Sequence, residues 1–419
     1  MAAKIVLMRK KIISAVMLFF IYSTVMSQSF ADMSGNCFKE DSCFTSSQIY
    51  KMDYVFSTVR NTYLAARGKV DLYMTVYSAA PLPKNIKKEN IFANGNYKQP
   101  FILLIHGGGF RAGCRTLIAN ECMEFAKRGY VVAAIDYRLG WAPGDEKKYC
   151  KGFCFDGACN IVLTSPCRKG LSDSLDFAVY RSIQDADAAM RYIAHYADNF
   201  NIDKRYLYVG GYSAGAITAV NLSYMNQKEL NAVIPKAKEK LGLYNTYGNS
   251  FTDKYKIAGL FNNWGGIKDT AYIKATGDRV PMIAFHGIDD SIVPLEKSYP
   301  FNCANGAYGS FTGSKLIYQR LIHKFPGIPV ELYVTYGKHG IFEESPSTDQ
   351  RALYRIQKAI CFFNRVRNGD KSQKFVEIDK NEDDITYDEL IKASPVECDN
   401  ENLQQSESVP IAFHPPHTN

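Results

Sequence analysis

Several patterns that would assign a function directly are missing from this chain. It has no Cys-x-x-Cys pair, no internal repeat, and no block of lysine and arginine interleaved with aromatic residues. Without such a block the sequence does not favour nucleic-acid binding, although its formal net charge is +8. Beyond residue 31 no apolar run is long enough to cross a bilayer, so we expect the rest of the chain to be soluble.

The first 31 residues have the pattern of a secretory leader. Four basic residues precede an apolar run at residues 12–26, and Ser29 and Ala31 are small residues at positions that a signal peptidase recognises. The run has 15 residues. A membrane-spanning helix needs ~20, so an uncleaved anchor is the less favoured alternative. We expect cleavage after Ala31 and a secreted or periplasmic mature protein without a stable membrane anchor.

Charge is distributed unevenly over the rest of the chain. Residues 370–419 contain twelve acidic residues and four lysines, a net charge of −8. A segment of this composition has little apolar surface to bury, and we expect residues 369–419 to form an acidic, flexible tail. The alternative is that this tail folds back onto residues 32–369, which have a net charge of +12 because the chain total of +8 includes +4 in the leader and −8 in residues 370–419. The ordered domain is then expected at residues 51–368, after a short cysteine-containing segment at residues 32–50.

All eleven cysteines lie beyond the leader. Four of them form a cluster: Cys150, Cys154, Cys159 and Cys167. In an exported protein this indicates disulfides, but four cysteines allow three pairings and the spacing does not choose among them. Structural zinc is less favoured because the cluster contains no histidine. Cys37 and Cys43 are candidates for a separate local bridge, whereas Cys361 is expected in the apolar core on a helix.

Strand and helix patterns alternate between residues 51 and 368. Continuous apolar runs at residues 101–105 and 130–135 are typical of buried parallel strands, and a helical pattern at 116–128 separates them. This unit builds doubly wound sheets, so we predict an α/β fold with a mostly parallel sheet flanked by helices. Further strands are predicted at 70–77, 206–209, 257–261, 281–285 and 329–335, and further helices at 179–193, 214–224, 313–324 and 348–367.

Residues 211–215, Gly-Tyr-Ser-Ala-Gly, follow the apolar run at 206–209 directly. A serine hydroxyl is a weak nucleophile in water, so an enzyme exposes it on a sharp strand-to-helix turn where a base reaches it. Glycines two positions either side permit that backbone. Ser213 is therefore the candidate nucleophile. The pentapeptide alone also occurs by chance as a flexible turn, so its context has to decide.

A second motif, His106-Gly-Gly-Gly-Phe110, follows the predicted strand at residues 101–105. Together with the serine motif it resembles the α/β-hydrolase superfamily, and within it secreted carboxylesterases and the feruloyl or acetyl-xylan esterase-like group. The resemblance extends from the strand near Val70 to the helix ending near Arg367. It implies the α/β-hydrolase fold, with His106 bracing the glycine loop rather than acting as a base.

The same resemblance implies an oxyanion hole. A tetrahedral intermediate carries negative charge on the former carbonyl oxygen, which preorganised backbone N–H groups stabilise. The implied donors are Gly108, Gly109 and Ala214, the residue after the nucleophile. The motif departs from hormone-sensitive-lipase-like enzymes and type-B carboxylesterases, which have Asp or Glu where this chain has Tyr212. This departure weakens any inference from the substrates of those groups to the substrate of this protein.

The superfamily's chain order of serine, acid and histidine directs the search for the partners of Ser213. His339 follows the last predicted strand, where the family carries its catalytic histidine. Residues 286–294 resemble the family's acid-bearing turn and imply Asp290 as the triad carboxylate, with Asp289 as the nearest alternative. Asp290 would fix the tautomer of His339 and stabilise the cation formed during attack.

These residues predict a serine esterase that cleaves a carboxylic ester, of a small molecule or linked to a polysaccharide, through an acyl-enzyme, with no cofactor or metal. A serine peptidase and a lipase are the alternatives on the same fold. Residues 139–170 hold the cysteine cluster and few apolar residues, so we expect a disulfide-held rim near the active site rather than a lipase lid. A non-catalytic binding protein is disfavoured because every expected triad residue is retained.

Overall fold

The computed structural model describes residues 37, 42–60, 69–86, 98–141, 167, 171–274, 279–303, 306–343 and 349–398. The expected leader, most of the insert expected at residues 139–170, and the last residues of the chain lie outside these ranges. Within the described part of the chain, no helix combines the length and the apolar character that a bilayer crossing requires.

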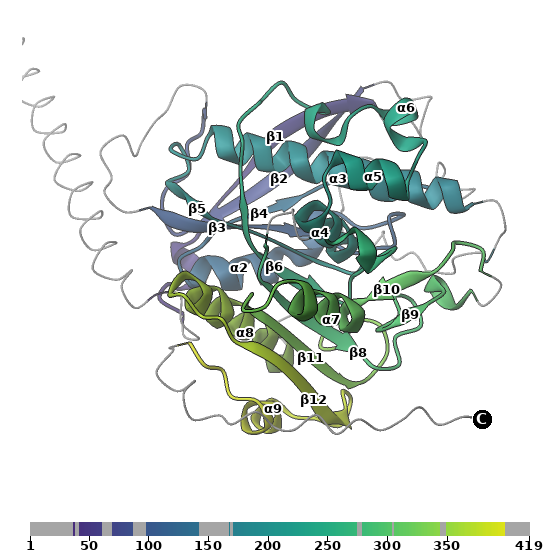
Figure 1. The fold of residues 1–419 in the computed structure, drawn as a ribbon. Helices are drawn as coiled ribbons and strands as arrows, with labels where there is room; N and C mark the ends of the chain where they lie inside the picture. The colour runs from purple at the N-terminus through teal and green to yellow at the C-terminus, as the bar shows by residue number, and fades with distance from the viewer. Residues whose placement is uncertain are drawn as a thin grey trace, which may run out of the picture.

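A nine-stranded sheet forms the centre of the molecule (Figure 1). In spatial order its strands are β1 (Tyr50–Arg60), β2 (Lys69–Ser78), β4 (Val131–Ile135), β3 (Gln99–Ile105), β5 (Ile202–Tyr212), β6 (Ile257–Asn263), β8 (Met282–Gly287), β11 (Val330–Tyr336) and β12 (Gln373–Asn381). The pairs β1/β2 and β2/β4 are antiparallel, whereas every pair from β4 to β12 is parallel. The predicted mostly parallel sheet is therefore confirmed.

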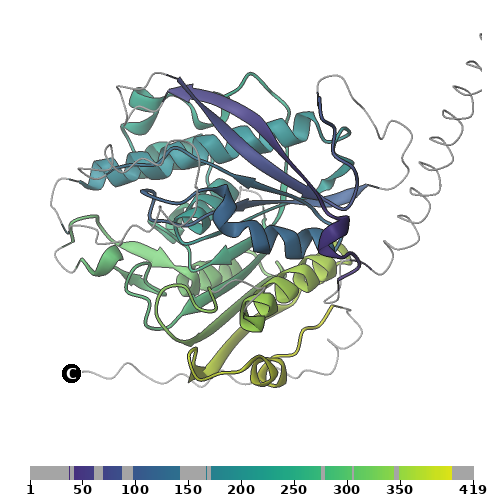
Figure 2. The same cartoon turned by 180° about the vertical axis from the view of Figure 1, so that it is seen from behind.

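Helices cover both faces of this sheet (Figures 1 and 2). Side chains alternate across a strand, so β3 contributes to two separate cores. Leu103 and Ile105 pack on the side of α3 (Ser172–His195), α4 (Ala214–Tyr224) and α7 (Ser314–Lys324). Ile102 and Leu104 pack on the side of α2 (Ala119–Lys127) and α8 (Gln350–Arg367). Burial on both faces explains why the central strands are continuous apolar runs rather than alternating ones.

Smaller elements complete the described structure. A second, three-stranded sheet lies beside α7 in the order β7, β10, β9. The remaining strands and α-helices are β7 (Gly266–Ile267), β9 (Lys297–Ser298), β10 (Phe311–Gly313), α5 (Gln227–Val233), α6 (Ala237–Leu241) and α9 (Tyr387–Ala393).

The C-terminal segment corrects the boundary expected at residue 368. β12 pairs in parallel with β11, and α9 packs against α8, so ordered structure continues to Cys398. The acidic composition was a misleading guide to order because a mean over the whole segment does not show that each strand or helix in it has one apolar face. Most of β12 is exposed or half-buried, but Ile378 and Leu390 are buried and join the core on the α8 side. A segment with one small apolar face needs few apolar residues.

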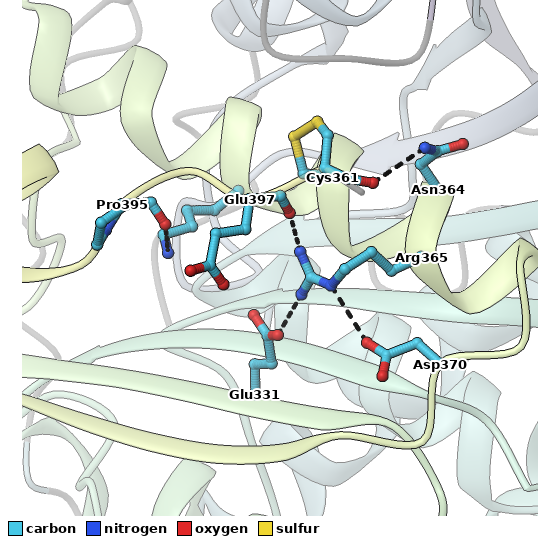
Figure 3. The surroundings of a disulfide bond; sticks show 9 residues. Glu331, Cys361, Asn364, Arg365, Asp370, Pro395 and Glu397 are labelled. Carbon is cyan, nitrogen blue, oxygen red and sulfur yellow. Dashed lines mark hydrogen bonds and ion pairs between the residues drawn. A yellow bond between two sulfur atoms is a disulfide. The ribbon is translucent and has the colours of Figure 1, made fainter. Parts of the chain in front are cut away.

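A disulfide and a buried arginine fasten this segment to α8 (Figure 3). Cys361 is buried in α8 as predicted, but it is also bonded to Cys398, which the sequence did not predict. Arg365, further along α8, is 2% exposed and donates hydrogen bonds to Glu331 of β11, to Asp370 and to the Glu397 carbonyl. Because an unpaired buried cation is strongly destabilising, Arg365 depends on the segment that supplies two of these partners.

Other disulfides agree only in part with the expected framework. The predicted Cys37–Cys43 bridge is confirmed. Cys167 is bonded to Cys303, which lies outside the cluster, whereas we expected the cluster cysteines to pair with one another. The fold brings these two residues to a Cα–Cα distance of 5.3 Å across a sequence separation of 136, which spacing along the chain does not reveal. The other three cluster cysteines lie outside the described residues.

Replacing Cys361 and Cys398 together with alanine should lower the free energy of unfolding by about 3–4 kcal/mol, because a disulfide restricts the unfolded chain more when it closes a longer loop. The bridge spans a sequence separation of 37. The matched control is the alanine pair at Cys37 and Cys43, with a separation of 6, for which about 2 kcal/mol is expected. Urea unfolding measures both, and equal losses would contradict the assigned role of the longer bridge.

Candidate active site

Ser213 lies at the turn between β5 and α4, in a strained backbone conformation of φ 54° and ψ −117°. The turn brings the backbone very close to its neighbours. A Cβ on Gly211 would lie 2.4 Å from the carbonyl carbon of Gly215, and one on Gly215 would lie 2.1 Å from the Ile105 carbonyl oxygen. Glycine is therefore required at both positions. The sequence pattern predicted this elbow, and the structure places it at the carboxyl end of the parallel strands.

The structure brings the three predicted residues together from the carboxyl ends of three strands. His339 follows β11, and Asp290 follows β8. His339 Nδ1 lies 2.8 Å from Asp290 Oδ2, and His339 Nε2 lies 2.7 Å from Ser213 Oγ. Since the carboxylate accepts the Nδ1 proton, Nε2 is left as the acceptor for the serine hydroxyl. In this tautomer the serine hydroxyl faces the ring nitrogen that can take up its proton.

Asp290 is held by a dense set of donors. Its Oδ1 accepts hydrogen bonds from the backbone N–H groups of Ile292 and Val293, at 2.8 and 3.0 Å, and its Oδ2 also lies 3.3 Å from His286 Nε2. Burial alone would raise the pKa of Asp290. Hydrogen bonds that His286 and His339 donate to the carboxylate, together with the charges of the two histidines, outweigh burial and hold the pKa of Asp290 well below its usual range. The carboxylate is therefore ionised at neutral pH.

The neighbouring carboxylate is placed differently. Asp289 is exposed, and its backbone N–H donates to the Gly337 carbonyl. The Asp290 side chain is fully buried against the histidine. Of the two candidates, the structure brings Asp290 and not Asp289 to His339.

The glycine loop lies beside the serine. Gly108 and Gly109 have φ values of 106° and 59°, and a Cβ on Gly108 would lie 2.2 Å from the Ala112 carbonyl oxygen. Trp141 donates from Nε1 to the Gly109 carbonyl at 2.8 Å, which fixes the orientation of that peptide. Ala214 is the first residue of α4, and the first N–H groups of a helix have no intrahelical acceptor.

His106 lies beneath the same loop. Its Nδ1–H donates to the Gly107 carbonyl at 2.7 Å, and its ring stacks on Tyr137 with centroids 4.4 Å apart. Burial is the main cause that lowers the pKa of His106, to about 4. This imidazole is therefore neutral, fully buried and remote from solvent, as a bracing residue should be.

Three residues near the serine were not singled out from the sequence: Asn263, Trp264 and Arg355. Asn263 ends β6, so the rule that side chains converge at the carboxyl end of parallel strands could have found it. Trp264 follows it with a positive φ of 44°, and its ring lies 6.3 Å from that of His339. Arg355 lies within α8 and gives no sequence signal that its charge is buried.

No cluster of three or more histidine, cysteine or acidic side chains is arranged to hold a metal ion in the part of the chain that the structure describes.

The parallel sheet, the serine turn after β5, and the acid and histidine after β8 and β11 together define an α/β-hydrolase fold. No protein-family model matches the chain. It is similar to Gut esterase 1 of Caenorhabditis elegans, with 26% identity over 45% of this chain and 30% of that protein. It is also similar to isoprenylcysteine alpha-carbonyl methylesterase ICME of Arabidopsis thaliana, with 23% identity over 54% of this chain and 51% of that protein.

The chain thus matches about half or less of the length of these relatives. Among solved structures it is similar to esterase 2 of Thermogutta terrifontis, with 19% identity and a TM-score of 0.47 over 77% of this chain and 97% of that one.

The depressed pKa of Asp290 predicts how stability depends on pH. A carboxyl whose folded pKa lies below its unfolded value of ~3.9 stabilises the fold above that value and loses this contribution as pH falls towards the folded pKa. Between pH 5 and pH 3 the wild type should therefore lose more unfolding free energy than Asp290→Asn, measured by urea unfolding. Asp289→Asn, at the exposed neighbour, is the control and should follow the wild type. Parallel curves for wild type and Asp290→Asn would contradict the assignment.

Proposed function

We propose that this protein is a serine hydrolase that cleaves carboxylic esters through an acyl-enzyme. The observation that carries the proposal is the hydrogen-bonded series Asp290–His339–Ser213, with contacts of 2.8 and 2.7 Å, ending at a serine in a strained turn. Such a series supplies a nucleophile, a base and a group that orients the base.

In the first half-reaction, Ser213 Oγ attacks the acyl carbon while its proton passes to His339 Nε2. The imidazolium that forms lies beside the ionised, fully buried Asp290, which stabilises it. Negative charge develops on the former carbonyl oxygen, and the backbone N–H groups of Gly108, Gly109 and Ala214 are the proposed donors to it. His339 then gives its proton to the leaving alcohol, and the acyl group remains on Ser213.

Water completes the cycle. His339 Nε2 takes a proton from the attacking water, and the same donors stabilise the second tetrahedral intermediate. When this intermediate collapses, the carboxylic acid leaves and the proton returns to Ser213 Oγ. Every proton transfer uses one imidazole nitrogen, so the tautomer set by Asp290 matters in both halves.

Two features support a narrower proposal. The relatives that the chain matches are named as esterases, which favours esters over amides. Bridges at Cys37–Cys43, Cys167–Cys303 and Cys361–Cys398 suit an oxidising compartment, which supports export. We therefore propose a secreted esterase, and from the resemblance of its motifs we propose that it belongs to the feruloyl or acetyl-xylan esterase-like group. Its substrate would be a small ester or one attached to a polysaccharide.

A substrate panel tests the reaction class. The wild type should hydrolyse short p-nitrophenyl esters, and methyl ferulate or acetylated xylan if the narrower proposal holds, whereas Ser213→Ala should lose at least ~10³-fold in kcat. A p-nitroanilide and a long-chain ester complete the panel. Turnover of the anilide alone would indicate a peptidase, and preference for the long chain a lipase. A folded wild type without activity on any of these substrates would contradict the esterase proposal.

A second pair of variants tests the triad itself. Asp290→Asn should lower kcat by about 10³- to 10⁴-fold, because the amide favours the wrong imidazole tautomer. Asp289→Asn should leave kcat within about two-fold of the wild type, since the exposed Asp289 side chain lies outside the Asp290–His339–Ser213 series and does not orient His339. Steady-state kinetics on one p-nitrophenyl ester is the measurement. The reverse order of effects would move the triad acid to Asp289.

A further inference from the structure

A buried arginine connects the two halves of the site from the opposite face of the sheet. Arg355 lies in α8, on the face away from α4, and is completely buried. We propose that Arg355 is a positioning residue that fixes the Ser213 turn and the His339 loop relative to each other. This inference rests on the proposed function and adds to it a residue that does not touch the substrate.

On the serine side, the connection runs through Asn263. Arg355 Nη1 donates to Asn263 Oδ1 at 2.8 Å. The other amide atom of the side chain, Nδ2, donates to the Gly211 carbonyl at 3.0 Å. The Asn263 backbone carbonyl accepts the N–H of Ser213, also at 3.0 Å. Asn263 therefore holds the nucleophile turn at two points, and Arg355 fixes the side chain of Asn263.

On the histidine side, Arg355 contacts the backbone of the loop that carries His339. Arg355 Nε and Nη2 both donate to the Phe342 carbonyl, at 3.1 and 2.7 Å. Phe342 lies three residues after His339 and has a positive φ of 54°. A non-glycine residue in that conformation persists only where its surroundings hold it. The two hydrogen bonds from Arg355 supply such a restraint to the loop that carries the base.

Aromatic rings hold the guanidinium in place between these two contacts. Its carbon lies 4.9 Å from the ring centroid of Trp264 and 5.5 Å from that of Tyr212. Such cation–π contacts strengthen when the cation is removed from water. Tyr212 is the residue that distinguishes this elbow from the Asp and Glu versions. Its ring gives the buried cation a surface at the base of the nucleophile turn.

Lysine cannot reproduce this arrangement. A guanidinium presents donors in a rigid planar fork, and here the fork serves Asn263 on one side and Phe342 on the other. An ammonium is a point charge that cannot span both acceptors. The expected consequence is a loss of alignment between Ser213 Oγ and His339 Nε2, and a misplacement of ~1 Å costs about 10²-fold in rate.

The experiment compares two charge-conserving replacements on one helix. Arg355→Lys should lower kcat by about 30- to 100-fold with KM within about two-fold, because alignment and not binding is lost. Arg365→Lys is the matched control. Arg365 is also a buried arginine of α8, but its partners are Glu331, Asp370 and Glu397. Arg365→Lys should therefore lower the stability of the fold while leaving kcat per folded molecule within about two-fold of the wild type.

Two further measurements keep the test decisive. Exhaustive labelling of Ser213 with a fluorophosphonate, followed by mass spectrometry, counts competent molecules and corrects for poor folding. The labelling rate also reports alignment without ester turnover. A wild type that labels but hydrolyses no ester would refute the proposed function while leaving Arg355 testable by that rate.

A double-mutant cycle with Asn263→Ala addresses the connection itself. If Arg355 acts on the serine through Asn263, the two losses in kcat should not multiply, and the double variant should lie close to the poorer single variant. Fully multiplicative losses would contradict the Asn263 route. The inference as a whole is overturned if Arg355→Lys keeps kcat and labelling rate within about two-fold of the wild type, or loses no more than Arg365→Lys.

Discussion

The backbone of Ser213 is the constraint around which the rest of the site is arranged. A residue with a side chain held at φ 54° and ψ −117° is strained, and such a conformation persists only when its surroundings determine it. Here the restraints come from β5 before the turn, α4 after it, and Asn263 beside it. The close approach to Ile105 excludes any side chain at Gly215. The strain exposes the hydroxyl to a base that comes from a distant part of the chain.

Parallel strands make this meeting possible. Ser213 and His339 are separated by 126 residues, and His339 and Asp290 by 49, yet all three follow strands that end at the same edge of one sheet. Each loop needs to supply only one side chain. Precision then depends on how firmly neighbouring loops are held together, and buried polar groups such as Asn263 and Asp290 supply that restraint through fully formed hydrogen bonds.

Local patterns predicted much of this site. The elbow at Ser213 depends on glycines a few residues away, and the central strands depend on continuous apolar runs, so both are visible in the sequence. Asp290 and His339 came from the order of motifs, which the fold then brought together. Arg355 was missed because its partners lie far away in sequence and nothing in α8 marks one charged residue as buried. The Cys167–Cys303 bridge was missed for the same reason.

Composition misled most at the C-terminus. β12 and α9 carry enough charge to suggest an unfolded tail, but each needs only one apolar face, and the bridge from Cys361 to Cys398 restricts the segment further. β1 was not predicted either. It pairs antiparallel with β2 at the other end of the sheet, where a strand with exposed residues such as Val55 has a mixed pattern.

The acidic strand β12 has a consequence for behaviour in solution. A strand at the edge of a sheet offers free backbone groups to other molecules, and charged side chains discourage that pairing. β12 exposes Glu377, Asp379 and Lys380 along such an edge. Its neighbour β11 is almost wholly buried and rich in β-branched and aromatic residues, a composition that promotes intermolecular stacking once uncovered. Because the Cys361–Cys398 bridge closes the chain segment that contains β12, it restricts the separation of this charged edge strand from β11.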